Sequence, residues 1–156
     1  MSITFKKYEA VKLECENHIR RLNHALSRTN KLFPLNVHAF EKLTEDEVAF
    51  IDQLVFRFSK LQDSMGHKLM TSGLILLGES AETLTMIDKL NLLEKLKLIE
   101  DKQRWLELRE LRNQIAHEYP EEQHIQIEAV NLLFEAAPYL IHVYHQFIQF
   151  IDAKIR

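Results

Sequence analysis

The sequence predicts an all-α protein that folds as a helical bundle in a single domain, residues 1–156. Only three Gly and three Pro interrupt the 156 residues. The chain is rich in Leu, Ile, Glu and Lys, and apolar and polar residues never alternate for more than a few positions, so no strand is predicted. A chain of this length can bury a real core. No linker, repeat or low-complexity segment divides it.

The first of five expected helices runs from about Ile3 to Arg28. Its apolar residues recur at helical spacing and form one stripe, made of Tyr8, Cys15, Ile19, Leu22 and Leu26. A loop around Pro34 follows. Thr44 and Glu47 then stand three residues apart, the spacing of a capping box, and we expect them to open the second helix.

The segment from Gly66 to Gly78 has two interpretations. Residues 74–77 are apolar on every side and lie between two glycines. A segment of this kind either extends the second helix or fills a dimer interface. The sequence leaves both interpretations open.

Three helices are expected in the remaining half of the chain. A third helix spans about Thr83 to Leu98, and Asp101 is the expected N-cap of a fourth. The last helix begins near Pro120 or Glu121. We expect Pro138 to kink this helix, since proline removes one backbone hydrogen bond.

The fourth helix carries an arginine on its apolar face. Residues of this face recur at spacings of three and four: Trp105, Leu108, Leu111, Ile115 and Ala116. Arg112 falls within the same stripe. A guanidinium stays charged, so it must find an anion or open water there. One interpretation is a structural ion pair, with Asp63 or Glu79 as the partner.

Polar residues gather where this helix ends. Tyr119 lies seven residues after Arg112 and projects from about the same face, while Asn113 and His117 share a neighbouring face. Pro120 ends the helix, because the residue before a proline avoids the helical conformation. Each residue alone has an ordinary structural explanation, such as a solvated amide or a favourable charge at a helix end. Together they indicate a site that binds and cleaves a phosphodiester.

The spacing Arg-x-x-x-x-His-x-Tyr, with Asn directly after Arg, resembles the signature of the HEPN superfamily, and in particular of HepT-like toxins. The order of the helices resembles the family along nearly the whole chain, including the segment from Arg57 to Asp63. The resemblance implies a five-helix, HEPN-like up-and-down bundle that forms a homodimer. It also implies the ribonuclease toxin of a type VII HepT/MntA-like toxin-antitoxin system.

The implied activity is a metal-independent RNA endonuclease, with transfer RNA as the first substrate to test. In this interpretation Arg112 binds the scissile phosphate and neutralises its growing charge. His117 transfers the proton, and Asn113 orients the histidine ring or binds phosphate. Because the 2′-hydroxyl of RNA is an internal nucleophile, no metal or cofactor is required. Arg57, Asp63 and Glu79 are the residues expected to contact and position Arg112.

The resemblance gives Tyr119 a separate role. In the family, an MntA-like nucleotidyltransferase antitoxin attaches AMP to the tyrosine of the motif. A bulky anion beside Arg112 would block the phosphate site. The alternative function is a non-catalytic subunit that binds a substrate or nucleotide for a nucleotidyltransferase complex. The intact set of four motif residues favours the nuclease.

The net charge, and the absence of membrane-spanning, signal-peptide, disulfide and zinc-binding patterns, exclude several classes of protein. The net charge of -3, from 20 basic and 23 acidic residues, is not that of a general nucleic-acid binder. The fourth helix nevertheless carries a basic cluster, Lys102, Arg104, Arg109 and Arg112. No apolar run of membrane-spanning length and no signal peptide appear, so we expect a cytoplasmic protein without a membrane partner. Cys15 is the single cysteine, which excludes a disulfide framework, and His142 and His145 lack the further ligands of a zinc site.

Overall fold

The computed structural model describes residues 2–116 and 122–155, and every regular element within these ranges is a helix. The elements are α1 (Ile3–Thr29), α2 (Val37–Glu41), α3 (Glu45–Ser64), the π-helical turn η1 (Met65–Leu69), α4 (Met70–Leu76), the 3-10 turn η2 (Ala81–Thr83), α5 (Met86–Lys95), α6 (Lys102–Ala116) and α7 (Gln123–Lys154). The prediction of an all-helical bundle is therefore confirmed.

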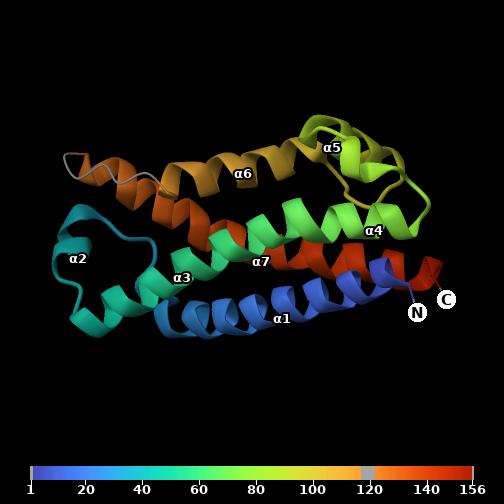
Figure 1. Ribbon diagram of the computed structural model, residues 1–156. Coiled ribbons are helices and arrows are strands. Elements are labelled where there is room, and N and C mark those ends of the chain that lie inside the picture. The colour runs from blue at the N-terminus through green and yellow to red at the C-terminus, as the bar shows by residue number, and fades with distance from the viewer. Residues whose placement is uncertain (1, 117–121, 156) are drawn as a thin grey trace.

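The long helices run up and down along one axis (Figure 1). Helix α1 leads away from the end where both termini lie, and α3, η1 and α4 return as one rod. Helix α6 then runs away again and α7 returns, while α5 lies at the end near the termini. The rod formed by α3 and α4 lies between α1 and α6, and α7 passes behind it. This order brings α3 and α6, which are distant in sequence, side by side.

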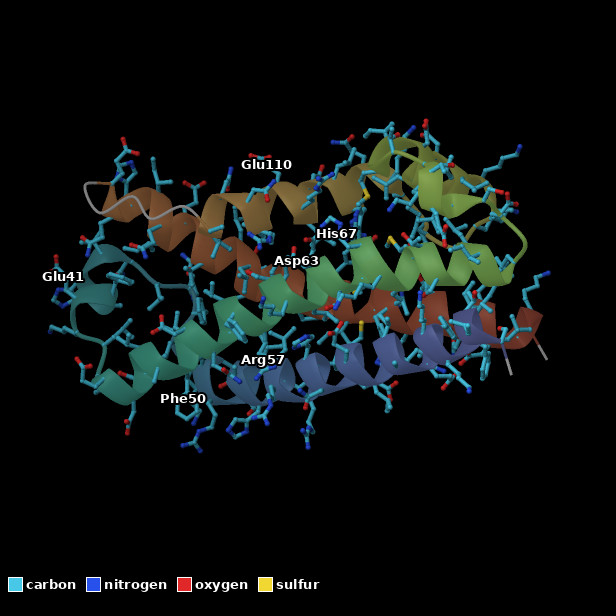
Figure 2. The ribbon with its side chains drawn as sticks, in the orientation of Figure 1. Glu41, Phe50, Arg57, Asp63, His67 and Glu110 are labelled. Atoms are coloured by element: carbon cyan, nitrogen blue, oxygen red, sulfur yellow. The ribbon has the colours of Figure 1, made fainter. Side chains whose placement is uncertain are left out.

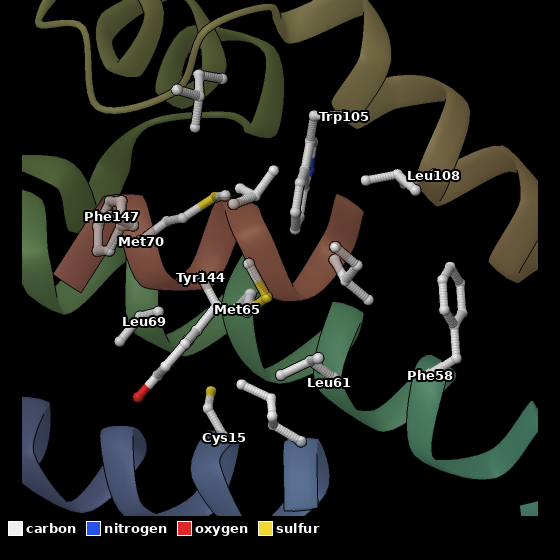
Figure 3. Packing of buried hydrophobic residues seen from close by; sticks show 14 of the residues in the cluster. Cys15, Phe58, Leu61, Met65, Leu69, Met70, Trp105, Leu108, Tyr144 and Phe147 are labelled. Carbon is white, nitrogen blue, oxygen red and sulfur yellow. The ribbon is translucent and has the colours of Figure 1, made fainter. Parts of the chain in front are cut away.

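One apolar core joins all four long rods (Figure 3). Its largest buried side chains include Trp105 from α6, Phe58 from α3 and Phe147 from α7. The hydroxyl of buried Tyr8 donates a hydrogen bond of 2.9 Å to Oδ1 of Asp152, which joins α1 to the end of α7. Cys15 is fully buried, and this burial raises the pKa of its thiol to about 12. The cysteine therefore packs as an apolar residue, as its position on the stripe of α1 predicts.

The capping box at the start of α3 is confirmed. Oγ1 of Thr44 accepts a hydrogen bond of 3.1 Å from the backbone N–H of Glu47, and Oε1 of Glu47 accepts one of 2.9 Å from the backbone N–H of Thr44. The loop around Pro34 holds a short helix, α2, that was not predicted. Asn36 caps it through a hydrogen bond of 2.8 Å from the N–H of Ala39. Five residues are too few to show a periodic apolar pattern, so α2 could not be predicted from such a pattern.

The segment from Gly66 to Gly78 extends the second predicted helix. Its backbone continues from α3 through η1 into α4, and Leu74 is fully buried within the protomer. The helix ends at Leu76, and Gly78 just beyond it has a φ of 90°, a conformation that favours glycine. The third helix, α5, is shorter than the predicted Thr83–Leu98. It begins after Thr85, whose side chain accepts a hydrogen bond of 3.1 Å from the N–H of Asp88.

The ends of the last two helices are partly as predicted. Oδ1 of Asp101 accepts a hydrogen bond of 2.9 Å from the N–H of Gln103, which confirms Asp101 as the N-terminal cap of α6. Helix α7 begins at Gln123 and continues through Pro138 as one helix of 32 residues. The predicted start at Pro120 or Glu121 lies outside the described residues. None of the described helices is both long and apolar enough to cross a membrane.

The close packing of α4 against α7 generates a first prediction. A Cβ atom on Gly73 would lie 2.7 and 2.8 Å from Cζ and Cε1 of Phe147. Gly73→Ala should therefore lower the free energy of unfolding by about 1–3 kcal/mol, as overpacking does. A glycine-to-alanine change inside a helix ordinarily raises it by about 1 kcal/mol. Urea denaturation measures the difference, and the second change Phe147→Leu should reduce the cost by making room. Equal or higher stability of Gly73→Ala would contradict the prediction.

Candidate functional site

The candidate site is built on an ion pair between α6 and α3. The buried face of α6, formed by Trp105, Leu108 and Leu111, packs on the core, so Arg112 one residue later meets α3. Its Nε and Nη2 donate hydrogen bonds of 2.9 Å each to Oδ1 and Oδ2 of Asp63, in the last turn of α3. The structure thus selects Asp63 as the partner of Arg112.

The ion pair is half-buried, with 27% of the Arg112 side chain and 31% of the Asp63 side chain exposed. Its hydrogen bond to Asp63 raises the pKa of Arg112, against the opposite effect of burial. The two bonds use one edge of the guanidinium. Within the described residues, Nη1 and the second N–H of Nη2 have no protein partner. The carboxylate therefore fixes the plane of the guanidinium and leaves its outer edge open for an anion.

The approach of α6 to η1 depends on Gly66. A Cβ atom at this position would lie 3.3 Å from Cζ2 of Trp105, so a larger residue would press against the indole ring. Gly66 lies in the π-helical turn, which the N–H of Met70 closes onto the carbonyl of Met65. Turns of this kind insert one residue into a helix and are frequent at functional sites. Here the turn follows Asp63 directly and places His67 beside it.

On one side of the ion pair lies a cavity of about 350 Å³, called the polar hollow below. It lies where α3 and η1 meet α6 and the start of α5, and is lined by Gln62, Asp63, Gly66, His67, Met86, Arg109, Arg112 and Asn113. Figure 2 shows Asp63 and His67 on the side of the rod that faces α6. Two cations, one imidazole and two amides thus surround a single carboxylate.

On its other side the ion pair borders a larger cavity of about 540 Å³, called the apolar groove below. Most of its lining is apolar and comes from α2, α3, α6 and α7: Phe40, Leu43, Val48, Ile51, Val55, Phe56, Ile115, Ala116, Ile125, Ala129 and Val130. Three of these large side chains are exposed, Val48, Phe56 and Ile125. Asp63 and Arg112 line both cavities, so the ion pair separates a polar surface from an apolar one.

The structure brings together only some of the predicted site residues. Asn113 lines the polar hollow beside Arg112. His117 and Tyr119 lie outside the described residues. Glu79 lies in the loop beyond α4, toward the end of the bundle that holds the termini (Figure 1). It does not reach Arg112.

Arg57, which was expected to support Arg112, contacts α1. Its Nη1 lies 3.0 Å from Nδ1 of His18 on α1. Arg57 precedes Asp63 by six residues, which places the two about 120° apart around α3. A guanidinium only donates hydrogen bonds, so Nδ1 of His18 accepts and the ring is neutral with its proton on Nε2. Burial, and then the charge of Arg57, lowers the pKa of His18.

Two residues of the polar hollow were not predicted, His67 and Gln62. His67 lies four residues after Asp63, and this spacing would have indicated a shared face. The basic cluster predicted on α6 separates into two parts. Arg109 faces the polar hollow, while the guanidinium of Arg104 lies 3.5 Å from the centre of the Tyr139 ring on α7.

The described residues contain no group of three or more His, Cys, Asp or Glu side chains that could hold a metal ion. Nε2 of His142 lies 3.8 Å from Oε1 of Glu100 on the exposed surface. Comparisons of the chain with protein-family models, with curated proteins and with solved structures find no match. The geometry of the site and the motif in the sequence therefore carry the functional argument.

The ion pair should contribute measurably to stability. A double-mutant cycle with Arg112→Ala and Asp63→Ala should give a coupling free energy of about 1 kcal/mol, because the pair is bidentate and half-buried. The exposed pair of Lys68 and Glu14, 3.1 Å apart, is the matched control, and its coupling should be about 0.3 kcal/mol. Urea denaturation measures the wild type, the four single variants and the two double variants. Equal coupling in the two cycles would show that Asp63 does not hold Arg112 in solution.

His18 should make stability depend on pH. Its pKa lies below the ordinary 6.5 in the folded protein, so just below pH 6.5 the unfolded chain binds more protons. The free energy of unfolding should therefore rise with pH through this window and be lost again on acidification. His18→Asn should flatten the profile between pH 5 and 7. The exposed His38 provides the control change, His38→Asn. An unchanged slope in His18→Asn would refute the assignment of a neutral ring.

Proposed function

We propose that the protein is a metal-independent RNA endonuclease and the toxin of a type VII HepT/MntA-like toxin-antitoxin system. The observation that supports this most directly is the orientation of Arg112. Asp63 holds one edge of its guanidinium, and the other edge opens beside Asn113 and the polar hollow. A fixed guanidinium with three free N–H groups is suited to bind a phosphate in bidentate geometry.

The proposed reaction uses the 2′-hydroxyl of RNA as the nucleophile. Its oxygen forms a bond to the phosphorus while the bond from phosphorus to the 5′-oxygen breaks, which leaves a 2′,3′-cyclic phosphate and a 5′-hydroxyl. One proton must leave the 2′-hydroxyl and one must reach the departing 5′-oxygen, and His117 is the residue proposed to transfer it. Arg112 would neutralise the charge that grows on the phosphate oxygens, without a metal.

Asp63 is a positioning residue in this scheme. Its carboxylate would repel a phosphate if it were free, but Arg112 neutralises it and donates both hydrogen bonds to it. Binding RNA then does not require the guanidinium to become ordered, because Asp63 already restricts its rotation. Pre-organised charge of this kind stabilises a transition state more than a flexible side chain does.

A homodimer is part of the proposal. Arg112 and His117 are five residues apart, about 140° around an ideal helix, so one copy brings them to a shared phosphate with difficulty. A second copy across the site would supply the missing group. The exposed side chains of Val48, Phe56 and Ile125 border the apolar groove next to Arg112 and are the surface that would support such an association.

Tyr119 is the proposed target of the antitoxin. A partner nucleotidyltransferase would transfer AMP from ATP to its hydroxyl with release of pyrophosphate, and so add a bulky anion seven residues after Arg112 in the sequence. The added phosphate would compete for the open edge of the guanidinium and exclude RNA. A second function, a non-catalytic subunit that binds nucleotide for the transferase, would use the same cavities without cleavage.

Purified protein should cleave bulk transfer RNA in the presence of EDTA. Arg112→Ala and His117→Ala should each reduce the rate about 100-fold or more, because each removes a group that acts in the transition state. Arg104→Ala is the matched control, since this guanidinium covers the Tyr139 ring on α7 and should leave the rate unchanged. Gel analysis of the fragments measures the rate and identifies the termini.

Inactive wild-type protein would refute the nuclease. If it still bound a nucleotidyltransferase, the binding-subunit function would replace the nuclease. Cleavage that Arg112→Ala does not affect would place the active site elsewhere on the protein.

A further inference from the structure

The polar hollow contains more hydrogen-bond donors than the ion pair uses. Gln62 is only 4% exposed, and its side chain lines the hollow. A primary amide both donates and accepts hydrogen bonds, so Gln62 can bind an anion in the hollow through its N–H groups. Asn113 adds a second amide from the facing helix α6.

Positive charge around the hollow exceeds negative charge. Arg109 lines it one turn before Arg112, and no carboxylate of the described residues forms a salt bridge with Arg109. Lys89 of α5 lies close enough that the charge of Arg109 lowers its pKa, although burial is the larger cause. Nζ of Lys89 donates a hydrogen bond of 3.1 Å to the hydroxyl of Thr71, which is neutral. Among the described residues that line the hollow, Asp63 is the only carboxylate, and Arg112 already neutralises it.

We infer that the polar hollow is a phosphate-binding subsite in which Arg109, His67, Gln62 and Asn113 bind the phosphate next to the scissile one along an RNA strand. The inference rests on the proposed nuclease, because the open edge of Arg112 binds the scissile phosphate. Arg109 belongs to α6 and His67 to η1, so an anion between them would contact both walls of the cavity. A volume of about 350 Å³ admits a phosphate together with several waters.

The subsite defines the substrate class. An RNA with a phosphate on each side of a nucleoside would fill both positions, whereas a dinucleoside monophosphate would fill only one. The enzyme should therefore prefer a chain that continues beyond the cut, as in internal cleavage. The subsite reads backbone charge and carries no information on base identity.

Binding can be measured without cleavage in the His117→Ala background. A fluorescent single-stranded RNA is titrated at several salt concentrations with His117→Ala alone, with added Arg109→Gln, and with added Arg104→Gln as the matched control. Loss of one phosphate contact should reduce the slope of log affinity against log salt by about 0.7. Arg109→Gln should show this reduction, and Arg104→Gln should keep the parent slope. Equal slopes in all three proteins would overturn the inference.

Two further measurements test the phosphate subsite independently of the proposed nuclease activity. In wild-type background, Arg109→Gln should slow cleavage of a trinucleotide about 10-fold and leave cleavage of a dinucleoside monophosphate unchanged, as loss of one charged contact allows. An equal loss on both substrates would indicate a general effect on the site and contradict the subsite.

Amide NMR with inorganic phosphate tests the hollow without RNA. Phosphate should shift the amide signals of Gln62, His67 and Asn113, and Arg109→Gln should abolish these shifts. This result would support the subsite even if the wild-type protein cleaves no RNA. In that case only the proposed nuclease activity would be refuted. Absence of these shifts, in protein that cleaves RNA, would refute the subsite and leave the nuclease in place. Circular dichroism of each variant confirms that the fold is intact.

Discussion

The bidentate hydrogen bonds between Arg112 and Asp63 are the interaction on which the rest of the site depends. Arg112 follows the buried face of α6, where an unpaired guanidinium would be costly. Asp63 removes this cost and at the same time determines which donors remain open. The contact is possible because Gly66 allows the backbone of η1 to pass close to the ring of Trp105. A packing constraint in the core thus determines the orientation of a charged group at the surface.

The ion pair also divides the surface into two chemically different cavities. A nucleotide is itself divided in this way, since its phosphate is charged and its base has an apolar face. The polar hollow and the apolar groove both border Arg112 and Asp63. One ligand could therefore contact both without placing charge against apolar side chains. The same arrangement would serve a nuclease or a nucleotide-binding subunit, and only the fate of the RNA distinguishes them.

Local sequence patterns predicted much of the fold and part of the site. The stripe of α1, the capping box at Thr44 and the N-cap at Asp101 follow from contacts within a few residues. Asp63 could be proposed as the partner of Arg112 because an arginine on an apolar face requires an anion. Gln62 and His67 were not predicted as site residues. They line the hollow because of the π-helical turn and the packing of α6, which local sequence patterns do not show. Arg57 lies about 120° from Asp63 around α3 and therefore contacts α1.

The contact at the candidate site joins residues that are closer in sequence than those joined by the contact at the end of the bundle. Asp63 and Arg112 are 49 residues apart, whereas Tyr8 and Asp152, which join α1 to the end of α7, are 144 apart. Closing the longer loop costs about 1 kcal/mol more in chain entropy. The two contacts also lie in different parts of the bundle. Opening of the contact between α1 and α7 at the termini therefore does not require the contact between α3 and α6 to open.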